Sequence, residues 1–360
     1  MSLYLDANAT EPLRPEARAA ALAAMDLLGN PSSVHAEGRA ARRVLEEARA
    51  KVAARFGAAP REVVFTSGGT EASALAITAL RRGRRLLVGA TEHPAVMRAA
   101  EGAQILPVRR DGTLDLPSLE AALAAGPPAL VCLMVANNET GVIHPVAKAA
   151  TLCHRHGALL HLDGVQAAGR IALSLHDLGA DTLAISGHKL GGPKGAGALL
   201  LRAGLDLTPL IPGGGQERGR RGGTEALPAI AGLGAAAEAA DPLGAARLAP
   251  LRDAIETRLG LPVAGVGAPR LPNTSCLILP GAAAETQVIA LDLAGIRVSA
   301  GAACSSGRVA RSPVLDAMGL GEAAGHAIRV SLPWNAPPDT VDRFLAAHGA
   351  MRARLSRPAA

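Results

Sequence analysis

Aromatic residues are scarce in this chain of 360 residues: one Trp, one Tyr and three Phe make up 1% of the sequence. Modules that bind single-stranded nucleic acid stack bases on aromatic side chains, so this scarcity excludes a dedicated module of that kind. The core must instead be built from Ala, Leu and Val. Apolar residues make up 49% and charged residues 19%, which is typical of a globular protein and excludes a wholly disordered chain.

Long apolar runs and paired cysteines are also missing. No window of ~18 uninterrupted apolar residues occurs, so we expect no membrane span. The start, Met-Ser-Leu-Tyr-Leu-Asp, lacks the pattern of a signal peptide. The four cysteines form no CxxC motif, which argues against a zinc site and against a disulfide framework. We therefore expect a cytoplasmic protein without a metal centre.

Most basic residues of this chain are arginines. Lysine occurs at only four positions, so each lysine is informative. The formal net charge is +6, and arginines cluster at residues 81–85 and 218–221. We interpret these clusters as solvated surface and expect no direct nucleic-acid binding; the alternative is a contact with an acidic protein or with RNA.

Short apolar runs alternate with Ala-rich amphipathic stretches between residues 62 and 201. This pattern predicts an α/β fold with a largely parallel sheet covered by helices. A helix is expected after the turn at 30–33, ending near residue 56. The expected strands are residues 63–65, 86–88, 105–108, 130–135, 159–162, 182–185 and 198–201.

The composition changes in the second half of the chain. Residues 211–225 are rich in Gly and Arg and predict a long functional loop. A Pro-, Ala- and Gly-rich stretch at 240–250 indicates a domain boundary. Shorter strands at 274–279, 297–299 and 328–331 then alternate with helices, which predicts a smaller α/β domain.

Two residues at the ends of expected strands suggest chemistry. Lys189 follows an apolar strand, where partial burial lowers the pKa of an amine and frees it for Schiff-base formation. Asp163 ends another strand, where α/β sheets place ligands, and an acid there can keep a pyridine nitrogen protonated. The alternatives are a surface lysine and an aspartate that caps the next helix.

Further polar residues follow other expected strands. The turn at 66–71 (TSGGTE) presents N–H groups and hydroxyls suited to an anion, or it is an ordinary helix start. Asn137 and Asn138 can hydrogen-bond an oxygen ligand, or they belong to a turn. His93 can stack on an aromatic ring and carry protons, or it is structural.

The cysteines divide into two groups. Cys132 and Cys276 lie in apolar strands and Cys153 lies on an expected helix, so all three are expected to be inert core residues. Cys304 lies in a segment of small residues, 299–307 (SAGAACSSG). That environment favours an accessible and reactive thiol.

Taken together, these segments resemble the cysteine desulfurases, pyridoxal-phosphate (PLP) enzymes of the class-V aminotransferase superfamily. The resemblance runs from 4–10 (YLDANAT) through 29–33 (GNPSS) to 327–331 (AIRVS). It implies the PLP-dependent transferase fold type I, with a large PLP-binding domain at 13–245 and a small domain made of 1–12 and 246–360. It also implies conversion of L-cysteine to L-alanine, with the sulfur passing to Cys304 as a persulfide.

The resemblance assigns a role to each matching residue. Lys189 would form the Schiff base with PLP, and Cys304 would accept the sulfur. His93 would stack on the ring, and Arg329 would bind the substrate carboxylate. The remaining cofactor contacts are Asp163 with the ring nitrogen, Gln166 and Asn138 with the phenolic oxygen, and Gly69, Thr70, Ser186, His188 and Thr224 around the phosphate; Asn8 and Asn138 would lie near the substrate.

The resemblance also implies partners. Thr224 would reach the phosphate across the interface of a homodimer. The loop from Cys304 to Ser312 is similar to that of the branch serving iron–sulfur assembly, nitrogenase maturation and tRNA thiolation, so a sulfur-accepting scaffold or thiolation protein is expected. Two positions depart from the family pattern: Val135 stands where many members have His, and the segment 332–335 (LPWN) replaces the usual glycine.

Three other functions are compatible with parts of this pattern. A selenocysteine lyase, or a PLP lyase for another β-substituted amino acid, would share most of the site. A catalytically weak platform protein would have lost at least one of the chemical residues, all of which are present. A generic nucleotide-binding protein would need a Gly-x-Gly-x-x-Gly turn after an N-terminal strand, and this chain has none there.

Overall fold

A seven-stranded sheet forms the centre of the computed structural model, which describes residues 2–300 and 311–355. The strand order is β2-β8-β7-β6-β5-β3-β4. β8 runs antiparallel to both of its neighbours, and the other strands share one direction. The strands are β2 (Val63–Thr66), β3 (Arg85–Gly89), β4 (Gln104–Leu106), β5 (Ala129–Met134), β6 (Leu159–Asp163), β7 (Thr182–Ser186) and β8 (Gly197–Leu201).

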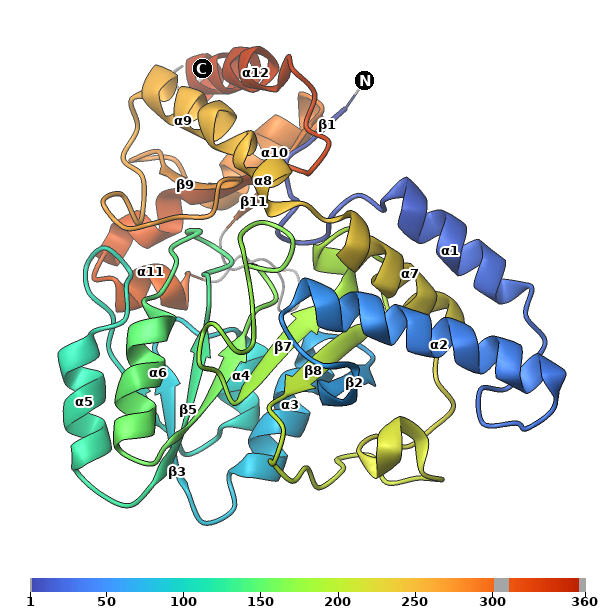
Figure 1. Cartoon of the computed structure of the whole chain (residues 1–360). Helices are drawn as coiled ribbons and strands as arrows, with labels where there is room; N and C mark the ends of the chain where they lie inside the picture. Colours follow the sequence, from blue (N-terminus) through green and yellow to red (C-terminus); the bar gives the residue numbers. More distant parts are fainter. Residues whose placement is uncertain (1, 301–310, 356–360) are drawn as a thin grey trace.

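Helices cover this sheet on both sides (Figure 1). The long helix α2 packs against α7, which in turn packs against α1. The buried residues of α2 include Ala41, Leu45, Ala48 and Val52, whose spacing of three and four places them on one face. The helices are α1 (Pro15–Met25), α2 (Ala36–Arg55), α3 (Gly69–Leu80), α4 (Pro94–Ala99), α5 (Leu116–Ala124), α6 (Val146–Arg155) and α7 (Leu227–Ala239).

The later part of the chain forms a second group of elements with the N-terminal strand. β1 (Leu3–Tyr4) pairs with β10 (Ile296–Arg297). A separate three-stranded sheet has the order β11-β12-β9. The other elements are α8 (Pro242–Ala246), α9 (Leu248–Leu259), β9 (Thr274–Ile278), α10 (Ala284–Leu293), β11 (Ser299–Ala300), α11 (Pro313–Ala317), β12 (Ala327–Ser331) and α12 (Thr340–Leu355).

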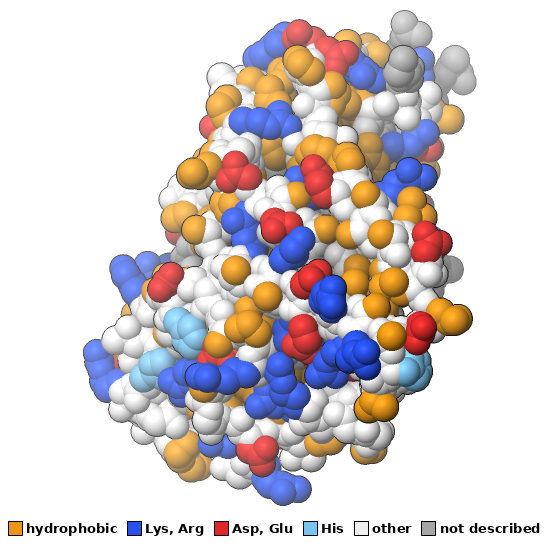
Figure 2. Space-filling model, turned by 45° about the vertical axis from the view of Figure 1, so that its right-hand side comes forward, with side chains coloured by type: hydrophobic (Ala, Val, Ile, Leu, Met, Phe, Trp, Pro, Cys, Tyr) orange, Lys and Arg blue, Asp and Glu red, His pale blue; other side chains and the backbone are white. Residues whose placement is uncertain are grey.

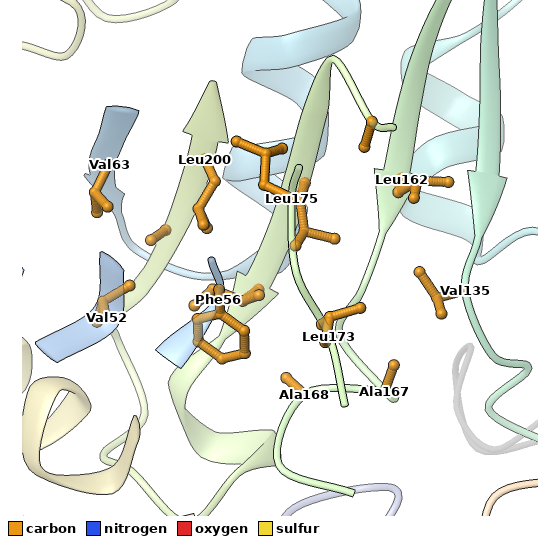
Figure 3. Packing of buried hydrophobic residues seen from close by; sticks show 14 of the residues in the cluster. Val52, Phe56, Val63, Val135, Leu162, Ala167, Ala168, Leu173, Leu175 and Leu200 are labelled. Atoms are coloured by element: carbon orange, nitrogen blue, oxygen red, sulfur yellow. The ribbon is translucent and has the colours of Figure 1, made fainter. Parts of the chain in front are cut away.

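The apolar core follows this arrangement. The largest cluster lies between the seven-stranded sheet and its helices, and Figure 3 shows part of it, including Phe56 just after α2 together with Leu175 and Leu200. A second cluster joins Leu3 and Leu5 to residues of α9, β12 and α12. The apolar and amphipathic pattern therefore predicted the strands and the long helix correctly. No helix of the described residues is both long enough and apolar enough to cross a membrane.

The basic residues lie mostly at the surface, as expected. Arg81, Arg82 and Arg218 are exposed. In Figure 2, Lys and Arg side chains are interspersed with Asp and Glu on the visible face. The segment 211–225 differs from a fully exposed loop, however, because Glu217 is buried and paired with Arg49.

Candidate active site

A cavity of about 280 Å³ lies at the carboxyl ends of β5, β6 and β7, beside the start of α3. Parallel strands bring the residues that follow them to one edge of the sheet, which is where α/β folds bind ligands. The cavity is lined by Gly69, Thr70, His93, Ala95, Met134, Ala136, Asn138, Asp163, Val165, Gln166, Ser186, His188 and Lys189. The structure thus brings together nine of the residues that the sequence singled out.

Lys189 lies in the short turn Gly187–Lys189 that follows β7. Its Nζ donates hydrogen bonds to the backbone oxygens of Asn8 (2.6 Å) and Ala9 (2.9 Å). Burial, together with the positive charges of Arg170 and Arg329, lowers the pKa of Lys189 to about 8. Near physiological pH the neutral form of this amine is therefore a minority, but a far larger one than for an ordinary lysine, which favours Schiff-base chemistry.

Asp163 is the last residue of β6, and His93 caps the start of α4. The Oδ1 of Asp163 accepts a hydrogen bond from the N–H of Val165 (2.9 Å). Burial raises the pKa of Asp163, while the charges of His93 and Lys189 oppose this rise. Removal of the His93 ring from bulk water lowers the pKa of His93. Its Nδ1 accepts from the N–H of Ala95 (3.1 Å), which leaves the proton of the neutral ring on Nε2.

The other end of the cavity is suited to an anion. Helix α3 has 12 residues and begins at Gly69, which lines the cavity together with Thr70 and Ser186. The first N–H groups of a helix have no partner within the helix and can bind an anion. The turn lies close to its neighbours, since a Cβ at Gly69 would lie 2.5 Å from Cγ2 of Val165. Burial and the charge of Lys189 lower the pKa of His188 to about 4, so its ring is neutral.

Arg329 and Asn8 lie beside the cavity rather than in its lining. Arg329 is buried in β12, and its Nη1 donates to the backbone oxygen of Asn138 (3.0 Å). The Nδ2 of Asn8 donates to the same oxygen (3.1 Å) and to Oγ1 of Thr274 (2.9 Å). These bonds connect the segment before α1 and the three-stranded sheet to Asn138, in the turn after β5.

Two further expected residues are Thr224, predicted to act across a dimer interface, and Cys304. Thr224 is exposed and does not line the cavity. Its loop is fastened to the start of α3, where Nε of Arg221 donates to Oε1 of Glu71 (2.9 Å). Cys304 lies outside the described residues. Cys132, Cys153 and Cys276 are buried, as predicted, and burial raises the pKa of Cys153 and of Cys276 to about 12.

Sequence reasoning missed three charged residues next to the cavity. Arg170 is buried and donates to Gln166 and Glu11. Glu92 is buried, its Oε1 accepts from the N–H of Met134 (2.6 Å), and burial together with the charge of Asp163 raises the pKa of Glu92 well above its usual value. Asp6 pairs with Arg329. For Glu92 a signal existed, because it precedes His93 at a strand–helix junction.

The departures from the family pattern are accommodated locally. Val135 is buried and its N–H donates to the backbone oxygen of Asp163 (2.8 Å). Trp334 packs against the segment before α1: its Nε1 donates to the oxygen of Pro12 (2.9 Å), and the guanidinium of Arg14 lies 4.7 Å from the ring centre. The altered segment therefore packs against the residues before α1 and does not line the cavity.

Comparisons with known proteins agree with this geometry. The aminotransferase class-V family profile matches residues 3–344. The cysteine desulfurase of Cereibacter sphaeroides is 47% identical, over 95% of this chain and 94% of its own, and that of Rhodobacter capsulatus is 42% identical, over 96% and 95%. This chain belongs to the cysteine desulfurases of the class-V aminotransferase family.

Solved structures of similar proteins have the same fold as this cysteine desulfurase. The NifS-like protein from Rickettsia africae has a TM-score of 0.90 and 33% identity, over 98% of this chain and all of that one. A structure titled SspA in complex with cysteine has a TM-score of 0.79 and 29% identity, over 92% of this chain. The fold type predicted from the sequence is therefore confirmed, and so is PLP as the cofactor of this enzyme.

The donor set of the cavity fits PLP. The cofactor needs an amine, an acid for its ring nitrogen, a flat surface for its ring and donors for its phosphate. Lys189 supplies the amine, Asp163 the acid and His93 the flat surface. The start of α3 with Thr70 and Ser186 supplies the phosphate donors.

Proposed function

We propose that this cysteine desulfurase moves sulfur from L-cysteine to its own Cys304 and then to an acceptor protein. The observation that supports the proposal most is the position of Lys189. Its amine, with a pKa lowered to about 8, lies in one cavity with the buried acid Asp163 and the anion-binding start of α3. An amine, an acid and an anion-binding helix start in one cavity match the aldehyde, the ring nitrogen and the phosphate of PLP.

Each residue of the cavity has one task in this proposal. Lys189 would hold PLP, and its amine would carry the proton that leaves the substrate Cα. Bound PLP supplies the electron-withdrawing ring that makes this proton and the Cβ–S bond labile. Asp163 keeps the ring nitrogen protonated. His93 covers the ring and holds a proton on Nε2, where it can exchange it with the substrate.

Orientation of the substrate is assigned to Arg329. A guanidinium binds a carboxylate through two parallel hydrogen bonds. Arg329 is held in place by Asn138, and its Nε is buried with no partner among the described residues. A donor without a partner costs free energy unless a ligand satisfies it. A substrate carboxylate would do so.

The sulfur step balances without an external oxidant. The Cys304 thiolate attacks the substrate sulfur, the Cβ–S bond breaks, and the bonding electrons stay on the substrate carbon. Protonation of that carbon gives L-alanine, while Cys304 carries the extra sulfur as a persulfide. A thiol then removes the outer sulfur. Segment 301–307 contains only small residues, which suits a thiol that must meet both the substrate and a protein acceptor.

A homodimer is part of the proposal. Thr224 is exposed, while its loop is fastened to its own chain through Arg221 and Glu217. A hydroxyl presented outward on a fastened loop is suited to a site in a second copy of the chain. The sulfur acceptor is proposed to be a protein of iron–sulfur cluster assembly or of thiolation.

The test is alanine formation from L-cysteine by the PLP-loaded protein, with a thiol reductant present. We expect many turnovers for the wild type. Cys304→Ser is expected to keep the visible absorption of bound PLP but to form no protein persulfide and pass no sulfur to an acceptor. Continued delivery by this variant would refute the role of Cys304. A wild type that binds PLP and makes no alanine from L-cysteine would refute the substrate.

A further inference from the structure

Arg170 is a buried cation next to the cavity, and the roles assigned above do not include it. It lies in the turn region after β6 and is 4% exposed. Its Nη1 donates to the backbone oxygen of Gln166 (2.8 Å) and to the side-chain Oε1 of Gln166 (2.9 Å). Its Nη2 donates to the oxygen of Ala7 (3.2 Å) and to Oε1 of Glu11 (3.3 Å). Arg170 does not line the cavity, but Gln166 does.

These contacts determine which way the Gln166 amide faces. A guanidinium has only donors, so the atom of Gln166 next to Arg170 must be the amide oxygen. The amide nitrogen is then 3.0 Å from the backbone oxygen of Asn8, which can only accept. Both ends of the amide are matched, and a flipped amide would bring donor against donor and acceptor against acceptor. The orientation of the amide therefore follows from the donors and acceptors around it.

The consequence reaches the cavity. The NH₂ group of Gln166 has two hydrogens, and only one is used by Asn8. The second is the polar group that Gln166 offers to a bound molecule. In the opposite orientation, Gln166 would present its carbonyl oxygen. That oxygen would repel the negatively charged phenolic oxygen of PLP.

Asn8 connects the same network to the reactive amine. Its backbone oxygen accepts from Gln166 and also from Nζ of Lys189 (2.6 Å). The guanidinium charge of Arg170 also lowers the pKa of Lys189. Arg170 thus acts on two groups that line the cavity: on the Gln166 amide by contact and on Lys189 through its charge.

We propose that Arg170 is a positioning residue, which holds the Gln166 amide so that its N–H faces the phenolic oxygen of PLP. This inference deepens the proposed function, because it rests on the assignment of Gln166 to that oxygen. Arg170 itself touches neither cofactor nor substrate. Its removal should therefore weaken PLP binding through Gln166, while the loss of its charge acts separately on Lys189.

The test is a double-mutant cycle with Arg170→Met, Gln166→Ala and the double variant. The readouts are the dissociation constant of PLP and the pH midpoint of the visible band of the bound cofactor. Each single variant is expected to weaken PLP binding about tenfold or more, the loss typical of a buried hydrogen bond to a charged group. Each should also move the pH midpoint. Only the dissociation constant enters the cycle, because the charge of Arg170 also acts directly on Lys189 and so on the pH midpoint. The double variant is expected to bind PLP as Gln166→Ala does, because Arg170 then has no amide left to position.

Additive effects in the cycle would overturn the inference and make Arg170 a merely structural residue. An unchanged PLP affinity and band in Gln166→Ala would overturn it as well, while alanine formation by the wild type would still stand. Arg170→Met leaves Glu11 without its buried partner, so the cycle is repeated with Arg170→Lys, which keeps the charge. The ammonium is expected to preserve most of the affinity by donating to Oε1 of Gln166, and the remaining loss should again vanish in the Gln166→Ala background.

Discussion

The guanidinium of Arg329 is paired with the carboxylate of Asp6, with Nη2 lying 2.6 Å from Oδ1. The two residues are 323 positions apart, yet β12 and the chain start bring them together beside the cavity. The Arg329 side chain is 4% exposed and that of Asp6 is 22% exposed. The Asp6 carboxylate thus already occupies Nη2 of Arg329, the residue proposed to bind the substrate carboxylate.

Arg329→Ala is expected to raise the KM for L-cysteine about 10- to 100-fold, since a charged hydrogen bond contributes roughly 1.5–3 kcal/mol. PLP binding should change little because Arg329 does not line the cavity. Steady-state kinetics and a PLP titration check both points. Arg155→Ala, which removes an exposed arginine paired with Glu120, is the control. Equal KM values for the two variants would contradict the assignment.

The reactivity of Lys189 in the PLP-free protein should depend on pH in an unusual range. A pKa lowered to about 8 means that the amine becomes neutral, and so nucleophilic, as the pH rises through about 8. Acetylation by a small anhydride, followed at the Lys189 peptide by mass spectrometry, should show a midpoint there. Free N-acetyl-lysine in the same solution provides the reference. A Lys189 midpoint that coincides with this reference would show that burial leaves the amine unperturbed.

Gly197 is expected to tolerate no side chain. A Cβ at this position would lie 2.6 Å from Cα of Gly68 and 2.7 Å from the oxygen of Ile185, and both are backbone atoms that cannot rotate away. Gly197→Ala should displace the turn before α3 and weaken PLP binding at least tenfold, measured by titration of the visible band. Gly349→Ala in α12 meets no atom within 4 Å and should leave PLP binding unchanged. Wild-type affinity in Gly197→Ala would mean that the turn does not hold the phosphate.

The pair formed by Arg49 and Glu217 is expected to dominate the stability of the loop at 211–225. Both side chains are nearly inaccessible and form two bonds of 2.7 Å, and Glu217 also accepts from the N–H of Phe65 on the edge strand β2. This pairing offsets the left-handed backbone at Glu217 (φ 48°) and Arg218 (φ 59°).

Glu217→Gln should therefore lower the free energy of unfolding by about 3 kcal/mol, because the buried charge of Arg49 then keeps only the more exposed Glu46 as its counterion. Denaturant unfolding measures the change. Glu120→Gln, which breaks an exposed ion pair with Arg155, should cost less than about 1 kcal/mol. Similar losses of unfolding free energy in both variants would show that burial does not strengthen the contribution of the Arg49–Glu217 pair.

Much of the site was predictable because its residues follow strands. Apolar runs that end in polar residues indicate where strands end, and the carboxyl ends of parallel strands meet at one edge. Asp163, Asn138 and Lys189 were found in this way. The direction of β8 was not predictable, because a strand buried on both faces has the same apolar pattern whichever way it runs.

The sequence by itself determined the α/β fold, the position of the reactive lysine and, through its ordered motifs, the enzyme family. Only the tertiary structure decided the partners of the buried charges: Arg170 with Gln166 and Glu11, Arg49 with Glu217, and Arg329 with Asp6. Local patterns report which side chains are apolar and where elements end. A buried ion pair between distant segments leaves no such pattern, because its stability comes from the low dielectric and exact contacts that exist only after the chain has folded.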